Sequence, residues 1–178
     1  MKIKVILIVA AIVVSVILMT VFGVQGIQNK AISYEEQIAT AQSEITVQEK
    51  RRADLIPNLV NCVKGYDAHE YQTLMDIVEA RGTSSDDVAE EVQTIISAVA
   101  EAYPELKSNE NYKQLMTELA TTENLIANYR SSYNNWVKRY NQYVRKFPAK
   151  QVLGMLGYEV VKYDYLEYKV DAPIVDFE

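Results

Sequence analysis

The distribution of apolar and polar residues divides the chain into one apolar segment and a longer part with helical periodicity. Residues 5–22 contain no charged residue, and only Ser15 and Thr20 interrupt the aliphatic run. At about 1.5 Å per residue, such a run spans most of a hydrocarbon layer roughly 30 Å thick. It also exceeds the roughly 7–15 apolar residues of a cleavable secretion signal. The pattern therefore predicts that residues 1–28 form an uncleaved transmembrane anchor. A cleaved signal peptide is the alternative.

After this segment, apolar residues recur at the three- and four-residue spacing of amphipathic helices. The first such stretch runs from residue 32 to residue 66 and is expected to continue the membrane helix. Pro57 should bend or break it within the preceding turn, because proline lacks the backbone N–H and its ring clashes with the helix. Gly65 is the expected C-terminal cap. A second helix is predicted from residue 67 to Gly82.

Two further helices are predicted from caps and proline positions. Residues 83–85 (Thr-Ser-Ser) are cap candidates for a helix that ends at Pro104. The longest apolar pattern then runs from Tyr112 to Phe147, a helix of about ten turns that Pro148 stops. A short helical turn is expected at residues 151–156.

The tail after this turn has a different composition. Residues 158–178 are rich in Tyr and Val and lack a helical period, which suits an extended segment laid against the bundle or against a partner. The sequence therefore predicts an all-α fold, in which an N-terminal transmembrane helix is followed by an antiparallel long-helix bundle of the four-helix type. The predicted domains are the anchor (1–28), the bundle (29–157) and the extended tail (158–178).

Charge narrows the classes of partner. Removing Lys2 and Lys4 with the first 22 residues leaves 16 basic and 24 acidic residues, a formal charge of −8. An acidic body argues against nucleic acid as a partner and against polybasic attraction to anionic lipid. Lys2, Lys4 and the α-amino group precede the apolar run, against Lys30 alone just after it, which favours a bundle on the extracytoplasmic side of the cell membrane.

Few residues suggest chemistry. His69-Glu70 resembles the start of the zinc-protease motif His-Glu-x-x-His, but Thr73 stands where the second histidine should be, and the chain has one histidine. Residues 86–91 contain four acids, which the helix dipole explains without a metal ion. Cys62 is the only cysteine and is expected to be a small buried residue. We therefore expect no catalytic residue, no cofactor and no metal site.

A polar stripe before and after Pro57 is the candidate partner-contact surface. Two interpretations are open: the stripe pairs internally with Glu123 or Arg130 of the long helix, or it faces a protein partner. The candidate contact residues are Arg51, Arg52, Asp54, Asn58, Asn61, Lys64 and His69. Tyr129, Tyr133 and Tyr140 form a separate ladder, for which core packing is favoured over a ligand groove.

Several sequence blocks carry a family resemblance. They are Arg51-Arg52-Ala53-Asp54-Leu55-Ile56-Pro57-Asn58-Leu59-Val60, Val63-Lys64-Gly65-Tyr66, His69-Glu70, Glu101-Ala102-Tyr103-Pro104-Glu105-Leu106-Lys107-Ser108-Asn109-Glu110, Tyr133-Asn134, Tyr140-Asn141, Phe147-Pro148 and Gly157-Tyr158. With these blocks in this order, the sequence resembles the LemA family of bacterial membrane-anchored helical proteins. The resemblance implies a short N-terminal membrane helix, a long-helix bundle and no established enzymatic activity. It is weaker near residues 33–43, where family members usually show Tyr-Asn and Trp-Ser.

Three functional hypotheses follow. The first is a non-enzymatic scaffold or interaction protein of the bacterial cell envelope, single-pass and membrane-anchored, with an unknown protein partner. The alternative is a hydrolase, or an accessory subunit of a membrane protease system, that uses His69. The third is a homo-oligomer in which residues 32–56 form a parallel coiled coil, although Gln48 and Arg52 at inward-pointing positions disfavour it.

Overall fold

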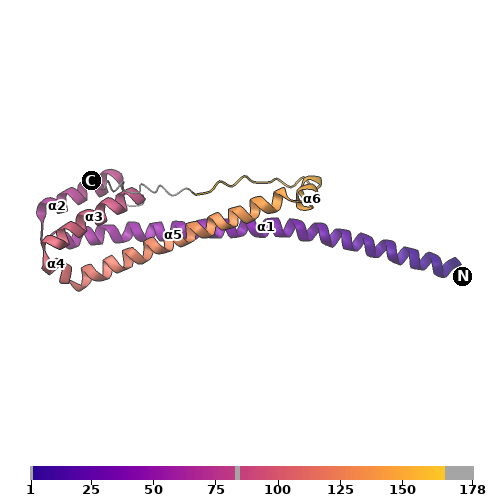
Figure 1. Cartoon of the computed structure of the whole chain (residues 1–178), viewed down its shortest axis with the longest axis horizontal. Helices are drawn as coiled ribbons and strands as arrows, with labels where there is room; N and C mark the ends of the chain where they lie inside the picture. Colours follow the sequence, from indigo (N-terminus) through magenta and orange to yellow (C-terminus); the bar gives the residue numbers. More distant parts are fainter. Residues whose placement is uncertain (1, 83–84, 167–178) are drawn as a thin grey trace, which may run out of the picture. The chain divides into compact units, whose positions relative to one another are not determined.

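The computed structural model describes residues 2–82 and 85–166, with residues 2–5 described by their backbone alone. Within these ranges all regular structure is helical, which confirms the predicted all-α class. The helices are α1 (Lys2–Val63), α2 (Ala68–Arg81), α3 (Asp86–Ala102), α4 (Pro104–Ser108), α5 (Glu110–Arg145) and α6 (Ala149–Met155), shown in Figure 1.

The first helix joins the apolar segment to the body without interruption. Its residues 6–22 are exposed. A window of 18 residues within α1 has a mean hydropathy of 2.9, so the helix is long and apolar enough to cross a membrane. Of the bend or break expected at Pro57, the break does not occur, and α1 continues to Val63, two residues before the expected end at Gly65. Ile56, Leu59 and Val60 are fully buried around the proline. Their packing offsets the backbone hydrogen bond that proline cannot make.

Capping residues in the loops after α1 and α2 determine where the helices begin and end. The side chain of Asp67 accepts hydrogen bonds from the backbone N–H groups of His69 and Glu70 and starts α2. Gly82 ends α2 with a φ of 74°, a left-handed conformation that favours glycine. Ser85 caps α3; the other two cap candidates, residues 83 and 84, lie outside the described residues. Gly65 is not the expected left-handed cap, because the positive φ angles among the described glycines belong to Gly82 and Gly157.

The chain forms two compact units. The terminal unit comprises the described residues of Met1–Thr40 and Tyr133–Glu178, and the central unit is formed by the described residues of Ala41–Ser132. Both units therefore take part of α1 and part of α5.

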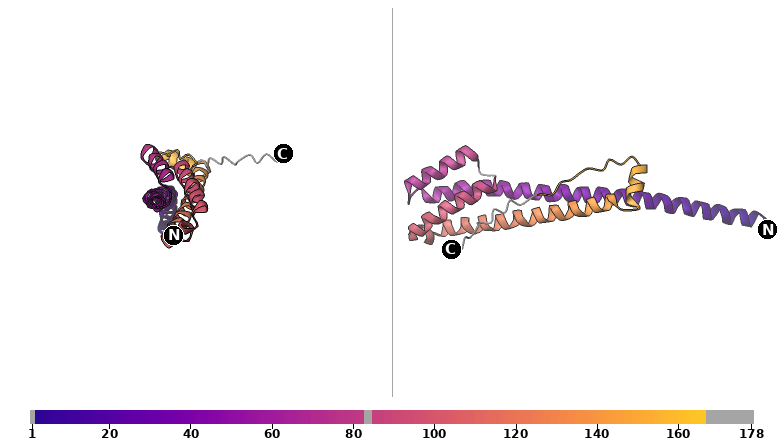
Figure 2. Two further views of the ribbon diagram at one scale, coloured as in Figure 1. Left: turned by 90° about the vertical axis from the view of Figure 1, so that its left-hand side faces the viewer. Right: turned by 45° about the horizontal axis from the view of Figure 1, so that its top comes forward.

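The central unit contains the larger apolar core. Figures 1 and 2 show α2 and α3 lying against the C-terminal part of α1. The core takes residues from five helices: Ile56, Leu59, Val60, Val63, Leu74, Val88, Ala89, Val92, Ile96, Val99, Ala100, Leu106, Tyr112 and Leu119. The short helix α4 inserts Leu106 into this core.

In the terminal unit α1 and α5 run antiparallel. Tyr143 donates a hydrogen bond to the carbonyl of Ile27 (3.0 Å), and Tyr140 donates one to Glu35 Oε1 (2.8 Å), so residue numbers rise along α1 as they fall along α5. Tyr34 packs its ring on Trp136 with centroids 6.3 Å apart.

The segment after α6 lies along α5 in the same unit. Residues 158–166 contain no helix, and we refer to them as the strap. Asn134 exchanges two hydrogen bonds with the backbone of Leu166, at 2.9 and 2.8 Å. The backbone N–H of Val161 donates to the hydroxyl of Tyr140. The strap is thus held by side chains of α5, while residues 167–178 of the predicted tail lie outside the described residues.

Candidate interaction surface

One member of the candidate stripe lies in the interior of the central unit. The side chain of Arg52 is fully buried, and its Nη1 donates to Asp86 Oδ1 at 2.7 Å. The same nitrogen lies 3.2 Å from Glu123 Oε2. For Arg52, the interpretation of internal pairing is therefore the correct one. Its side chain is not on the surface that a partner could contact.

A second arginine closes this ion-pair network. Arg130 donates to Asp86 Oδ1 at 3.1 Å and to Glu49 Oε1 at 2.9 Å, so Asp86 pairs with two guanidinium groups. Burial acts to raise the pKa of Asp86, but hydrogen bonds from Arg130 and Arg52 outweigh it and lower that pKa below its ordinary value. The pKa of Arg130 is raised, chiefly by its hydrogen bond to Asp86. The first acid of α3 thus has a structural role in addition to its place at the helix start.

The other members of the stripe on α1 and directly after it are exposed. Arg51, Asp54, Asn58 and Asn61 follow one another along the outer side of α1, and Lys64 follows its last residue. Arg51 lies 3.6 Å from Glu118, and the ammonium group of Lys64 lies 5.4 Å from the centroid of the Tyr71 ring. Exposed contacts of this kind contribute little to stability, so these side chains can exchange them for contacts with another molecule.

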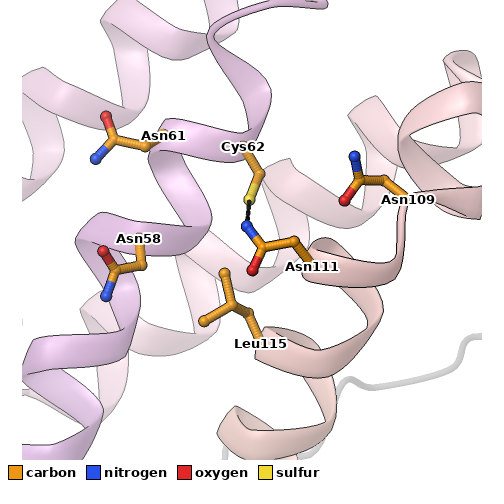
Figure 3. A pocket seen from close by; sticks show the side chains of 6 residues that line it. All are labelled: Asn58, Asn61, Cys62, Asn109, Asn111 and Leu115. Carbon is orange, nitrogen blue, oxygen red and sulfur yellow. Dashed lines mark hydrogen bonds between the residues drawn. The ribbon is translucent and has the colours of Figure 1, made fainter.

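Two of these exposed residues line a hollow between α1 and the start of α5. The hollow has a volume of about 470 Å³, and Figure 3 shows Cys62 and Asn111 facing each other in it. Its lining residues are Asn58, Asn61, Cys62, Asn109, Asn111 and Leu115. We call it the amide hollow because four of its six residues carry a carboxamide.

The chemistry of the amide hollow is that of neutral hydrogen bonding. Each carboxamide carries two N–H donors and one carbonyl acceptor. Asn58 Nδ2 already donates to the carbonyl of Asp54, and Asn109 Oδ1 accepts from the backbone N–H of Tyr112. Asn111 Nδ2 lies 3.7 Å from the sulfur of Cys62, and burial raises the pKa of that thiol, which keeps it protonated. Among the residues that the structure describes, no group of His, Cys, Asp and Glu is placed to hold a metal ion. The hollow is therefore suited to binding polar, uncharged groups rather than to nucleophilic or metal chemistry.

His69 lies apart from this arrangement. It is exposed in the first turn of α2, where its backbone N–H donates to Asp67 Oδ1 at 3.0 Å. Its carbonyl accepts a hydrogen bond from the hydroxyl of Thr73, the residue that stands in place of a second zinc-binding histidine. His69 is thus located at a helix start, where its backbone takes part in the cap.

Four of the six lining residues were missing from the sequence-based candidates, namely Cys62, Leu115 and the two amides Asn109 and Asn111. Asn109 and Asn111 follow Pro104 by a few positions, and Asn109 belongs to one of the blocks that carry the family resemblance. Their place opposite Asn58 depends on the pairing of α5 with α1, which a single sequence does not give. In the tyrosine ladder, Tyr133 and Tyr140 are buried.

Sequence comparisons relate this chain to known proteins. The model of the LemA family matches residues 41–177. Protein LemA of Metamycoplasma hominis is 27% identical over 134 residues, which cover 68% of this chain and 61% of that protein. Magnetosome protein MamQ of Magnetospirillum gryphiswaldense is 31% identical over 80 residues, 45% of this chain. A MamQ protein of Paramagnetospirillum magneticum is 32% identical over 80 residues. The matched part spans 29% of the length of each of these magnetosome proteins.

Proposed function

Because this chain belongs to the LemA family, whose model matches residues 41–177, we propose that it is a non-enzymatic, membrane-anchored interaction protein of the bacterial cell envelope. α1 anchors it in the membrane and continues into the bundle. The excess of Lys2 and Lys4 over Lys30 supports an extracytoplasmic bundle.

The amide hollow is the observation that carries the interaction role. Four carboxamides border one recess, two from α1, one from α5 and Asn109 from the junction of α4 and α5, next to exposed Arg51 and Asp54 on the same side of α1. A polypeptide backbone in an extended segment presents N–H and C=O groups in alternation, and each group can pair with a carboxamide. The partner that fits this chemistry is a protein segment, which agrees with the acidic balance that disfavours nucleic acid.

The division between buried and exposed charged residues in the central unit supports the proposed interaction role. Arg52, Arg130 and Asp86 form structural ion pairs, and the charged residues left on the outer side of α1 have weak contacts only. Buried ion pairs of this kind can fix helix register, and the exposed side chains on the outer side of α1 remain available for binding.

Site-specific crosslinking in cells tests the proposal. A photo-reactive amino acid replaces Asn61 in the full chain, and a matched control carries it at Glu90, an exposed position of α3. We expect a discrete protein adduct from position 61 that is lost when Asn58→Ala and Asn111→Ala are added, with helicity unchanged. Equal adducts from both positions, or an adduct that survives the two alanine substitutions, would contradict a specific role of the hollow.

A further inference from the structure

The corner between α5 and α6 exposes large apolar side chains in the terminal unit. Phe147 is 81% exposed, Met155 86% and Leu156 45%. Side chains of this kind are normally covered by the core, a partner or a membrane. What covers them here follows from their position along α1.

The corner lies level with the end of the apolar segment. The hydrogen bond between Tyr143 and the carbonyl of Ile27 fixes the register of the two antiparallel helices. α5 ends at Arg145, two residues and about 3 Å beyond Tyr143 toward the N-terminus of α1, and Phe147 follows in the turn before α6. This places the start of the corner near residues 23–25 of α1, just after Phe22, the last residue of the continuous aliphatic run. Figure 1 shows α6 at the end of α5 from which α1 continues toward its N-terminus.

The same corner is basic, unlike the chain as a whole. Residues 145–158 contain Arg145, Lys146 and Lys150 and no acidic residue, in a chain of net charge −6. A hollow of about 290 Å³ opens beside it, between α5, α6 and the strap. Arg145, Lys150 and Lys162 are among its lining residues, together with the amide of Asn141. Lys162 also lies 3.3 Å from Asp164, an exposed neighbour in the strap.

We propose that the α5–α6 corner is a second membrane contact, in which Phe147, Met155 and Leu156 enter the bilayer interface and the basic hollow holds the headgroup phosphate of an anionic phospholipid. This inference rests on the membrane anchorage in the proposed function. The membrane is the expected partner of the corner, because α1 fixes the position of the corner by its pairing with α5. The exposed apolar segment of the same helix begins directly beside the corner. Aromatic and basic side chains together are the usual composition of such interfaces.

Two contacts instead of one change what the anchor does. A single transmembrane helix is free to tilt in the bilayer and carries the terminal unit with it. Insertion of the corner holds the α1–α5 pair at one angle to the bilayer and ties that angle to the content of anionic lipid. Each cation near an anionic surface contributes about 1 kcal/mol, so three cations correspond to a preference of roughly a hundredfold for anionic over neutral lipid.

Depth-dependent quenching tests this proposal on the full chain in lipid nanodiscs. In a Cys62→Ser background, Phe147→Cys carries an environment-sensitive fluorophore, and Met155→Cys provides an independent second position. Lys138→Cys, exposed on α5 and farther from the anchor, is the matched control. Met19→Cys reports whether the anchor itself is in the bilayer. The quencher is a spin label on the upper acyl chain of phosphatidylcholine.

In discs that contain phosphatidylglycerol, we expect strong quenching at positions 19, 147 and 155 and little at 138. Quenching at 147 should fall in pure phosphatidylcholine, and Arg145→Gln, Lys150→Gln and Lys162→Gln together should reproduce that fall in the anionic discs. Quenching at 19 but not at 147 or 155 would overturn the second contact and leave the anchor intact. Loss of quenching at 19 as well would overturn both. Equal quenching at 147 with and without the three cations would overturn the headgroup site.

Discussion

The Nη1 atom of Arg52 lies 2.7 Å from Oδ1 of Asp86, which joins the start of α3 to the C-terminal part of α1 within the central unit. Glu123 of α5 accepts from the same nitrogen. One buried guanidinium of α1 thus contacts two other helices, and Arg130 also contacts Asp86. The register of α1, α3 and α5 in this unit is fixed by charge as well as by apolar packing.

Arg52 should be required for stability. Arg52→Met leaves Glu123 without this cation in a partly buried position, and removal of one partner from a buried pair costs about 3 kcal/mol. Unfolding of the detergent-solubilised full chain in urea, followed by circular dichroism, measures the effect. The control is Arg51→Met at the exposed neighbouring position, whose 3.6 Å contact with Glu118 contributes at most about 1 kcal/mol. Equal losses for the two variants would show that Arg52 is not a structural residue.

Acid should weaken the central unit through Asp86. Its pKa in the folded chain is below the ordinary value of 3.8, because the hydrogen bonds from Arg130 and Arg52 outweigh the effect of burial. A lowered pKa stabilises the folded chain above the ordinary value, and this contribution is lost as pH falls through the folded pKa. We expect the melting temperature to fall below about pH 4 and Asp86→Asn to reduce this fall. Asp87→Asn, at the exposed adjacent position, should retain the wild-type pH profile; identical profiles for both variants would exclude this role of Asp86.

Tyr140 should hold the strap. Its buried hydroxyl donates to Glu35 and accepts from the backbone N–H of Val161, so Tyr140→Phe should cost about 1–2 kcal/mol. Amide hydrogen exchange should become faster at Val161 in this variant. Tyr165→Phe, at a half-exposed position of the strap, is the control and should leave exchange at Val161 unchanged. Unchanged exchange in Tyr140→Phe would mean that other contacts hold the strap.

The folded state should become less stable at alkaline pH because of Tyr140 and Tyr158. Burial and the nearby carboxylate of Glu35 raise the pKa of Tyr158 to about 12, and burial and the hydrogen bond to Glu35 raise the pKa of Tyr140. A raised folded pKa means that the stabilisation is complete below the ordinary value of 10 and is lost as pH rises through the folded value. Unfolding measured between about pH 9 and pH 12 should show a smaller loss in Tyr140→Phe than in the wild-type chain.

Much of the fold could be predicted from the sequence, because it depends on local rules. The apolar run, the caps at Asp67 and Ser85 and the long pattern that ends before Pro148 are properties of neighbouring residues. The continuity of α1 through Pro57 could not be predicted in this way, because it depends on the burial of Ile56 and Leu59 against other helices. The local rule for proline gives the cost of the missing hydrogen bond and not the packing that offsets it.

The candidate surface could be predicted only in part for a similar reason. Helical spacing places Arg51, Asp54, Asn58 and Asn61 on one stripe, and all four are exposed. Arg52 is one residue from Arg51, about 100° around the helix, and that rotation separates an exposed cation from a buried one. Asn109 and Asn111 enter the hollow through the pairing of α1 with α5, which is a non-local property.

Cysteine accessibility in intact cells is the most direct test of membrane crossing by α1 and of the side on which the bundle lies. In a Cys62→Ser chain, a cysteine is placed either at position 3 (Ile3→Cys), which keeps Lys2 and Lys4, or after Glu178, and a membrane-impermeant maleimide is added before or after lysis. A single crossing with an extracytoplasmic bundle predicts labelling of the C-terminal cysteine in intact cells and of position 3 only after lysis. Labelling of both positions in intact cells would contradict a membrane-crossing anchor, and the reverse pattern would place the bundle in the cytoplasm.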